Sequence, residues 1–529
     1  MQIKTQISPE GLLDSKSALS HLSDGRSLRT AVESLVVSGR SSGRAARVLL
    51  NQLADFIDEQ SATFYQQESD GLKLRDPKTA RDHKRMVRAS VAEQAATQAV
   101  LGILGSDGLL DDERFTKLVD KSGMLERLGR WKEHIQTMRE RAVEAAEQFT
   151  KEHRGVKIQK VKIFGLGGSG APHDVAKDIV SNFHKSSIEI EVVHADTPNA
   201  DYVTPRTLAI FCSFSGNTEE ILHCYKMVSR KTGLCVALAK GGKLRERACR
   251  VNMPFIQLPE KNHPAFVMQP RESACLQMAA ILTLLAKIGL ARGSAWSLTE
   301  DSLAFRKAIA LIARCRKRFG PQIPFRRNSA KQLAFFLLYG IKWTGRGKLP
   351  AYDLWGKKVP FILADRNNAG IGHEVRTQIH ERSKLNAAFY DAPEFLHNMV
   401  ESIRAGVESA KATLDPDNYV YYFIQSADEE PRIRLRLDKT IKLVMNGKAN
   451  YAVLNAEGDN PFHRALFATY FNAHMTTYLA ILNGFDPLPV PTMSWMKNVM
   501  DGFKRDGKEE RNANARNRSG LKMWPTQGS

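Results

Sequence analysis

Residues 161–170 read Val-Lys-Ile-Phe-Gly-Leu-Gly-Gly-Ser-Gly, and residues 207–218 read Thr-Leu-Ala-Ile-Phe-Cys-Ser-Phe-Ser-Gly-Asn-Thr. Each stretch begins with an apolar run typical of a buried strand, passes into a loop of glycine and hydroxyl residues, and leads into a helical pattern. Glycine lets the backbone approach a ligand closely, and the N–H groups at a helix start attract anions. The two loops together predict a phosphate cradle formed by Gly168, Ser169, Ser213, Ser215 and Thr218.

The first loop also matches G-x-G-x-x-G, the fingerprint of dinucleotide-binding folds. Such folds use one glycine loop and an acidic residue after the next strand, a place that Asp196 could fill. They do not explain a second hydroxyl loop two strands later. Two such loops at the carboxyl ends of neighbouring parallel strands favour a single phosphoryl group over a dinucleotide or plain turns.

These two motifs, Gly-Gly-Ser-Gly and Ser-Phe-Ser-Gly-Asn-Thr-Glu-Glu, resemble those of the sugar isomerase (SIS) domain. SIS domains occur in isomerases, aminosugar enzymes and sugar-sensing regulators. The resemblance therefore implies a fold and a sugar-phosphate ligand without implying one reaction.

The length of 529 residues is enough for two or three domains. Lys and Arg outnumber Asp and Glu by 77 to 57, which gives a net charge of +20. This excess favours anionic substrates, and it is also compatible with nucleic acid or an acidic membrane. No secretory leader or membrane-spanning pattern is present, so we expect a cytoplasmic protein without a membrane partner. The six cysteines form no Cys-x-x-Cys pair and are expected to be buried thiols.

Alternating apolar runs and helical stretches predict an α/β fold with two flavodoxin-like, doubly wound parallel-sheet domains of SIS type. We expect a helical appendage over residues 1–114, a first domain with lead-in helices over 115–320, a second domain over 328–500, and a basic, disordered tail over 501–529. The appendage is rich in Lys and Arg but lacks helix-turn-helix spacing, so nucleic-acid binding is not our main interpretation.

Four further residues are of types suited to acid–base chemistry or anion binding. Arg271 stands at the predicted start of a helix, where it could pair with a phosphate or a substrate carboxylate, or form a surface salt bridge. Glu381 ends the first helix of the second domain, His397 follows about sixteen positions later, and Lys497 lies on the last helical pattern.

These stretches, together with the loops, resemble the bifunctional phosphoglucose/phosphomannose isomerase family over roughly residues 115–500. The resemblance implies that Glu381 is the proton-transfer base, that His397 opens the sugar ring, and that Lys497 is the active-site lysine of the family. It also implies a homodimer in which His397 reaches the neighbouring subunit's site. An enzyme of this kind would work in glycolysis and gluconeogenesis.

Three of the departures from the family pattern near these residues bear on the chemistry. His380 and Arg382 replace the asparagines on either side of the base, and Arg382 is a new cation that could pair with Glu381 or depress its pKa. Val490 stands where the family has a threonine associated with accepting both C2 epimers, so activity on mannose 6-phosphate is left open.

The chemistry of an aldose–ketose isomerase fits these residues. A carboxylate moves a proton between carbon 2 and carbon 1 through an enediol, an imidazole assists ring opening, and a lysine stabilises negative charge. The sequence therefore predicts an isomerase that interconverts glucose 6-phosphate and fructose 6-phosphate and needs no metal or cofactor. The alternatives are a non-catalytic sugar-phosphate sensor and an aminosugar-phosphate isomerase, although we find no ammonia source for the latter.

Overall fold

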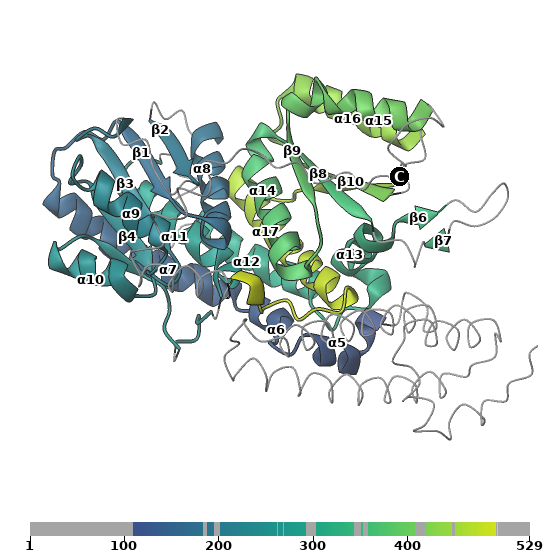
Figure 1. Ribbon diagram of the computed structural model, residues 1–529, viewed down its shortest axis with the longest axis horizontal. Coiled ribbons are helices and arrows are strands. Elements are labelled where there is room, and N and C mark those ends of the chain that lie inside the picture. Colours follow the sequence, from purple (N-terminus) through teal and green to yellow (C-terminus); the bar gives the residue numbers. More distant parts are fainter. Residues whose placement is uncertain are drawn as a thin grey trace, which may run out of the picture. The chain divides into compact units, whose positions relative to one another are not determined.

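The structure is a computed structural model that describes residues 109–183, 188–194, 202–261, 263–267, 269–291, 303–342, 351–352, 358–408, 418–446, 450–493 and 495. Two parallel sheets flanked by helices lie in one compact unit that ends at Pro487 (Figure 1). Residues 488–529 form a separate unit, described only in part. The predicted α/β class with two doubly wound sheets is confirmed. Nearly all of the predicted appendage and the whole tail lie outside the described residues, and the domain boundaries stay predictions.

The first sheet has five parallel strands in the order β2-β1-β3-β4-β5, the order of flavodoxin-like folds. The strands are β1 (Lys160–Phe164), β2 (Glu189–Val193), β3 (Thr207–Ser213), β4 (Cys235–Ala239) and β5 (Phe255–Gln257). The helices around them are α7 (Trp131–Glu152), α8 (Ala171–Phe183), α9 (Glu219–Val228), α10 (Gly242–Arg250) and α11 (Ala274–Lys287).

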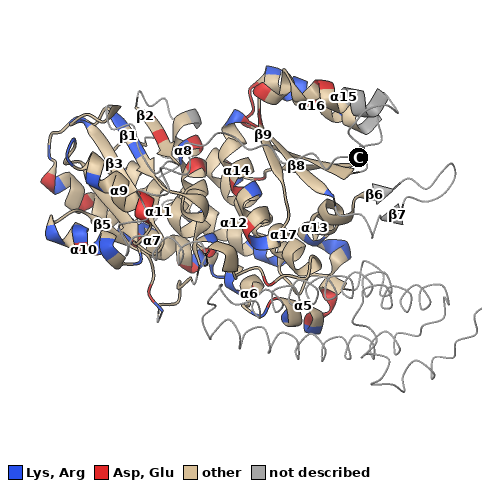
Figure 2. Cartoon of the chain, viewed as in Figure 1, with Lys and Arg blue, Asp and Glu red and all other residues tan. Residues whose placement is uncertain are grey.

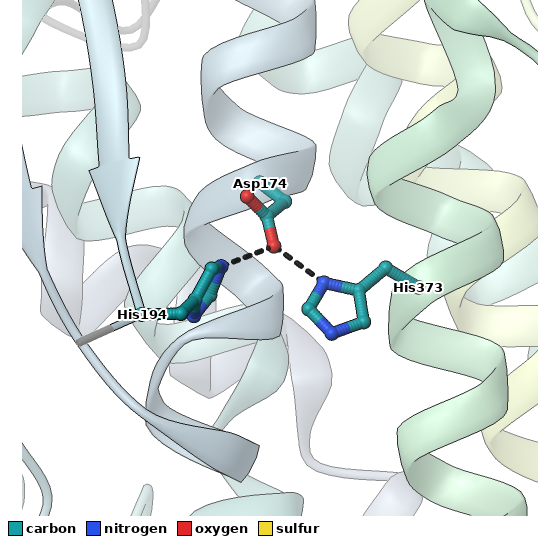
Figure 3. Close-up of side chains that lie close together, drawn as sticks. All are labelled: Asp174, His194 and His373. Atoms are coloured by element: carbon teal, nitrogen blue, oxygen red, sulfur yellow. Dashed lines mark hydrogen bonds and ion pairs between the residues drawn. The ribbon is translucent and has the colours of Figure 1, made fainter. Parts of the chain in front are cut away.

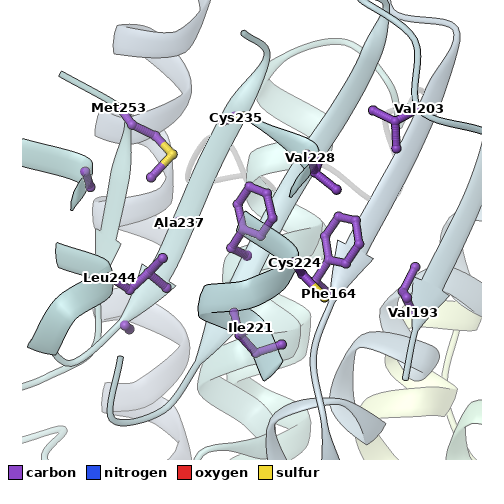
Figure 4. Close-up of a cluster of buried hydrophobic side chains, with 14 residues drawn as sticks. Phe164, Val193, Val203, Ile221, Cys224, Val228, Cys235, Ala237, Leu244 and Met253 are labelled. Atoms are coloured by element: carbon purple, nitrogen blue, oxygen red, sulfur yellow. The ribbon is translucent and has the colours of Figure 1, made fainter. Parts of the chain in front are cut away.

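The central strands β3 and β4 are buried on both faces, as expected for a parallel sheet covered by helices, whereas the edge strands β2 and β5 are partly exposed. All residues of β3 are buried. On one face, side chains of β1, β3 and β4 pack with α9 and α10 in the cluster shown in Figure 4. The Phe164 and Phe211 rings stack there with centroids 5.1 Å apart. This packing fixes the ends of β1 and β3, and therefore the starts of the two loops that follow them.

The second sheet has four parallel strands in the order β11-β10-β8-β9. Counted within this half, the order is the same as in the first sheet without its last strand. The strands are β8 (Val359–Asp365), β9 (Ala388–Ala392), β10 (Tyr419–Gln425) and β11 (Asn450–Asn455), and the helices are α14 (Ala369–Gln378), α15 (Met399–Glu408), α16 (Pro431–Asn446) and α17 (Pro461–Leu482).

Helix α17 is buried along almost its whole length. It packs against α12 (Leu303–Phe319), α13 (Ser329–Tyr339) and α14, which explains why apolar residues occur on all its sides. The remaining helices of the described chain include α5 (Glu113–Val119) and α6 (Met124–Leu128), which precede α7. No helix in the described ranges combines the length and apolar character needed to cross a bilayer.

Three expectations need correction. The stretch 333–355 has an apolar and aromatic pattern that predicts a helical insertion, but it does not form one helix, because α13 ends at Tyr339 and the short antiparallel strands β6 (Ile341–Lys342) and β7 (Ala351–Tyr352) follow. The helix predicted over 370–381 ends at Gln378 and continues as a π-helical turn, η8 (Ile379–Ser383). All six cysteines are free thiols, but Cys249 is exposed since it lies near the end of the short surface helix α10.

Two buried histidines predict loss of stability in acid. Burial lowers the pKa of His134 in α7 to about 3 and that of His474 in α17 to about 4. Below pH ~6.5 the unfolded chain therefore binds protons that the folded chain does not, and stability falls as pH falls. We expect a loss of about 2 kcal/mol per histidine in the free energy of unfolding between pH 7 and pH 5.

Denaturant unfolding at both pH values measures this loss. His134→Leu should reduce the pH dependence, whereas His223→Gln, at an exposed position of α9, should leave it unchanged. An equal pH dependence in His134→Leu and the unmutated protein would contradict the prediction.

Candidate active site

The first loop leaves β1 and enters α8 through a 3-10 turn, η2 (Gly167–Ser169). Gly167 has a φ of +53°, a left-handed conformation that glycine adopts without strain. The Gln277 amide donates a hydrogen bond of 3.3 Å to the Gly168 carbonyl and holds the turn against α11. Gly168 and Ser169 are both buried at the base of this loop. The backbone of this loop is therefore held in one conformation at the start of α8.

The second loop is organised by a buried hydroxyl. Ser213 Oγ lies 2.8 Å from Thr218 Oγ1 and accepts a hydrogen bond of 3.0 Å from the Gly216 N–H. Thr218 is half-buried at the start of α9, and Ser215 is exposed and accepts from the Asn217 N–H at 3.1 Å. Ser213 therefore shapes the loop, while Ser215 and Thr218 stand nearer to solvent.

The two loops lie at the same edge of the first sheet. Strands β1 and β3 are parallel neighbours, with Phe164 opposite Phe211, so the loops that follow their carboxyl ends leave side by side. Basic helix α10, visible as a blue segment in Figure 2, begins at the second loop, where the Lys243 N–H donates to Asn217 Oδ1 at 3.0 Å. Lys243, in the first turn of α10, adds a positive charge at this edge, and Glu219 and Glu220, in the first turn of α9, add negative charges.

Glu381 comes from the second sheet's half of the unit and lies over the first loop. It sits in η8, the π-helical turn that follows α14, and its side chain is about a quarter exposed. A Cβ atom added to Gly167 would lie 3.4 Å from Glu381 Oε1, and one added to Gly168 would lie 3.4 Å from Oε2. The carboxylate therefore faces the glycine backbone directly, and any larger side chain in the loop would crowd it.

Arg271 is the cation beside this carboxylate. It lies in a 3-10 turn, η4 (Pro270–Glu272), whose start is fixed by reciprocal hydrogen bonds between Gln269 and Glu272. Its side chain is 1% exposed, and Nε lies 3.5 Å from Glu381 Oε2. Burial lowers the pKa of Arg271, opposed by the charges of Glu381 and Glu272. A surface salt bridge, one alternative for this residue, is thus excluded.

The Arg382 guanidinium binds α17 and η4. Its buried guanidinium points away from the Glu381 carboxylate, donating to the Ala473 carbonyl of α17 at 2.6 Å and to the Arg271 carbonyl at 2.9 Å. The neighbouring His380 bonds the backbone of Ala387 at 3.0 Å. Of the two possibilities for Arg382, pairing with Glu381 is not the arrangement found, because its guanidinium is engaged by these carbonyl groups and joins η4 to α17.

Lys384 is a site residue to which the sequence analysis gave no role. It takes a left-handed backbone conformation, with φ of +55°, directly after η8. Its ammonium donates to the Glu381 carbonyl, and burial, followed by the charge of Arg271, lowers its pKa to about 8. The only sequence signal was its position three residues after the base. The left-handed turn that folds it back beside Glu381 is not visible in the hydrophobic pattern.

His397 lies at the other end of the second sheet from Glu381. Glu381 precedes the start of β9, whereas the exposed His397 follows its end and lies 3.4 Å from Arg436 Nη1. Strand β9, which has five residues and is about 17 Å long, lies between them in the chain. Within one chain, then, His397 does not join the group formed by Glu381, Arg271 and the first loop. Lys497 lies outside the described residues.

Comparisons with known proteins agree with this architecture. Residues 345–500 match the bacterial phospho-glucose isomerase C-terminal SIS domain. The chain is 28% identical over 366 residues to the bifunctional phosphoglucose/phosphomannose isomerase of Caldicellulosiruptor bescii, covering 69% of this chain and 96% of that protein. It is 25% identical over 342 residues to the protein of the same name from Aquifex aeolicus, covering 64% and 88%.

Among solved structures, a hypothetical protein from Thermus thermophilus aligns with a TM-score of 0.52 and 14% identity over 78% of this chain and 98% of that one, which supports the fold alone. Over about two thirds of its length the chain is therefore similar to bifunctional phosphoglucose/phosphomannose isomerases, and this similarity together with the fold supports an isomerase enzyme.

Proposed function

We propose that the protein interconverts glucose 6-phosphate and fructose 6-phosphate through an enediol, with Glu381 as the base. The observation that carries the proposal is the Glu381 carboxylate, which faces the backbone of Gly167 and Gly168 beside the buried Arg271. A substrate whose phosphate rests on the loops of the first sheet would extend its carbon chain toward this carboxylate. The names of the related proteins give the substrate class.

The reaction needs one base that both takes and returns a proton. The Glu381 carboxylate removes the proton from carbon 2 of the open-chain aldose while O1 gains a proton, which gives the enediol. Glu381 then delivers a proton to carbon 1 while O2 loses its hydroxyl proton and becomes the ketone oxygen, so the proton gained at O1 balances the proton lost from O2. A base must lie within hydrogen-bond reach of the carbon acid. Since Glu381 is held over the loop by η8 and pairs with Arg271, it is oriented before substrate arrives.

The phosphate contacts fall into two groups. The buried turn around Gly168 and Ser169 supplies backbone, and Ser215 and Thr218 supply hydroxyl and backbone donors at the start of α9. Ser213 supports Thr218 through their 2.8 Å hydrogen bond. Helix starts of this kind bind phosphate through free N–H groups and the helix dipole.

Two cations are suited to stabilise negative charge on the enediol oxygens. Arg271 adjoins the Glu381 carboxylate, and Lys384 lies against the Glu381 main chain. Electrostatic stabilisation by fixed, desolvated cations is often the largest single contribution to catalysis. We retain Lys497 as a third cation on the basis of the family resemblance.

Ring opening is assigned to His397 of a second copy of the chain. Glu381 comes before β9 and His397 after it, at opposite ends of a strand about 17 Å long, and this placement favours a homodimer in which His397 serves the partner's site. We propose that this dimer works in the cytoplasm.

A coupled assay tests the function. Purified protein incubated with fructose 6-phosphate should produce glucose 6-phosphate, followed by a dehydrogenase that consumes it. Mannose 6-phosphate is the second substrate to assay, because Val490 lacks the threonine hydroxyl of the family. Saturable binding of fructose 6-phosphate without turnover would exclude the isomerase and leave a sugar-phosphate sensor.

Gly216→Ala is expected to damage the phosphate cradle. Gly216 has a φ of +76°, and a Cβ there would lie 1.8 Å from the Gly241 carbonyl oxygen, so the second loop must move. We expect KM for fructose 6-phosphate to rise about 100-fold, equivalent to about 2.7 kcal/mol of lost binding. Gly233→Ala is the matched control, because its Cβ would meet no atom within 4 Å. Equal KM values for the two variants would contradict the assignment of the loop.

A further inference from the structure

Three side chains from separate elements converge beside the first loop (Figure 3). Asp174 lies in the first turn of α8, His194 directly follows β2, and His373 projects from α14 of the second sheet's half. Asp174 Oδ2 is 2.9 Å from His194 Nε2 and 2.6 Å from His373 Nδ1. One ligand atom from each residue lies within 4.8 Å of the other two.

Glycines make this convergence possible. A Cβ on Gly370 would lie 2.5 Å from the Asp174 backbone, so its absence lets α14 approach α8 closely one turn before His373. A Cβ on Gly170 would lie 2.8 Å from the His194 ring. The loop and both helices are therefore packed closely around the two imidazole groups, and this backbone packing brings the three side chains together.

The contacts of the two His194 ring nitrogens determine which of them carries a proton. His194 Nδ1 lies 3.0 Å from the Gly165 carbonyl oxygen, which only accepts, so Nδ1 carries a proton. In the neutral imidazole, Nε2 then directs a lone pair at the Asp174 carboxylate, which also only accepts. A positive species between them removes the repulsion. A proton on Nε2 can supply this charge, and so can a metal ion, which would also bind Nδ1 of His373, the second nitrogen that faces the same oxygen.

We infer that Asp174, His194 and His373 form a binding site for a divalent transition-metal ion, Zn²⁺ by ligand type. Two imidazole nitrogens and one carboxylate oxygen are ligands that zinc prefers, and they leave a fourth position for water. Tetrahedral Zn²⁺ separates its nitrogen and oxygen ligands by roughly 3.3 Å, so the side chains need to move apart by less than about 1 Å. The bond from His194 Nδ1 to the Gly165 carbonyl is the outer-shell contact that commonly orients metal-bound histidine.

The surroundings allow an ion to enter. The His194 and His373 side chains are 33% and 25% exposed, while Asp174 is 11% exposed at the bottom of the cluster. The nearby cation Lys177 is paired with Asp178 at 3.4 Å. The bound ion would join the first loop, through His194 and Gly165, to α14, whose end carries η8 and Glu381. It would hold the two halves of the unit together. The inference of a metal site does not depend on the proposed isomerase reaction.

Metal titration of the full-length protein tests the inference. Protein prepared without a histidine tag is stripped with a chelator and titrated with Zn²⁺ against a chromophoric competitor, and separately with Co²⁺ by visible absorption. We expect one equivalent per chain, a Co²⁺ spectrum of tetrahedral type, no competition from Mg²⁺, and a higher melting temperature with Zn²⁺.

Single-site variants locate the ion. Asp174→Asn, His194→Gln and His373→Gln should each weaken Zn²⁺ binding about 100-fold or more and abolish the Zn²⁺-dependent rise in melting temperature. His223→Gln, on the exposed side of α9, should bind as the unmutated protein does. If Asp174→Asn fails to fold, Zn²⁺ binding by the two histidine variants decides whether the site exists. Absence of stoichiometric Zn²⁺ uptake, or unchanged uptake in both histidine variants, overturns the site and leaves a proton-linked ion pair.

Discussion

Replacing Glu381 by glutamine is expected to lower kcat for fructose 6-phosphate about 1,000-fold, within the range that a positioned general base contributes. Glutamine keeps the shape of the side chain over Gly167 and Gly168, so the loop should remain intact. It cannot accept the proton from carbon 2. KM should change less than threefold, because the phosphate contacts lie in the first sheet's loops and not in η8.

The control for this variant is Glu246→Gln, an exposed position on α10, which should retain full activity. Solvent hydrogen exchange at carbon 1 of fructose 6-phosphate gives a second readout, since it reports proton removal even when net conversion is slow. Loss of both exchange and turnover in Glu381→Gln with normal substrate binding supports the base. Retention of exchange at the unmutated rate would show that another group moves the proton.

The sequence is a good guide to the sheets because its buried strands are continuous apolar runs. The stretch 207–213 is buried at every residue, and the apolar run 161–164 falls within β1. The two loops follow from their glycines and hydroxyl groups, whose conformational needs are local. These features depend on neighbours in the chain, so a pattern of residue types is enough to predict them.

The directions of side chains at the site depend on tertiary contacts, and therefore the sequence did not predict them. Arg382 follows Glu381 directly, yet it turns into α17 because Ala473, Thr476 and Thr477 supply oxygen acceptors there. The sequence alone allowed Arg271 to be a surface residue, whereas in the structure it is buried in η4. The cluster of Asp174, His194 and His373 brings together residues up to 199 positions apart, a distance at which no sequence spacing signals a site.

Mixing two inactive variants is expected to restore activity if sites are shared between subunits. Glu381→Gln and His397→Gln should each have little activity alone, because one lacks the base and the other lacks the ring-opening group. In a heterodimer of the two, one site receives both substitutions, while the other receives Glu381 from one chain and His397 from its partner. Random pairing makes half of the dimers heterodimers, so about one quarter of the unmutated activity should return.

The experiment requires co-expression with two different affinity tags, so that heterodimers are isolated directly and carry about one half of the unmutated activity per dimer. Glu381→Gln co-expressed with itself is the control and should show no recovery. A site built from one chain would give no recovery in the heterodimer either, because every site would then carry one substitution. Glu381 and His397 stand at opposite ends of β9, a strand about 17 Å long, and this placement leads us to expect recovery.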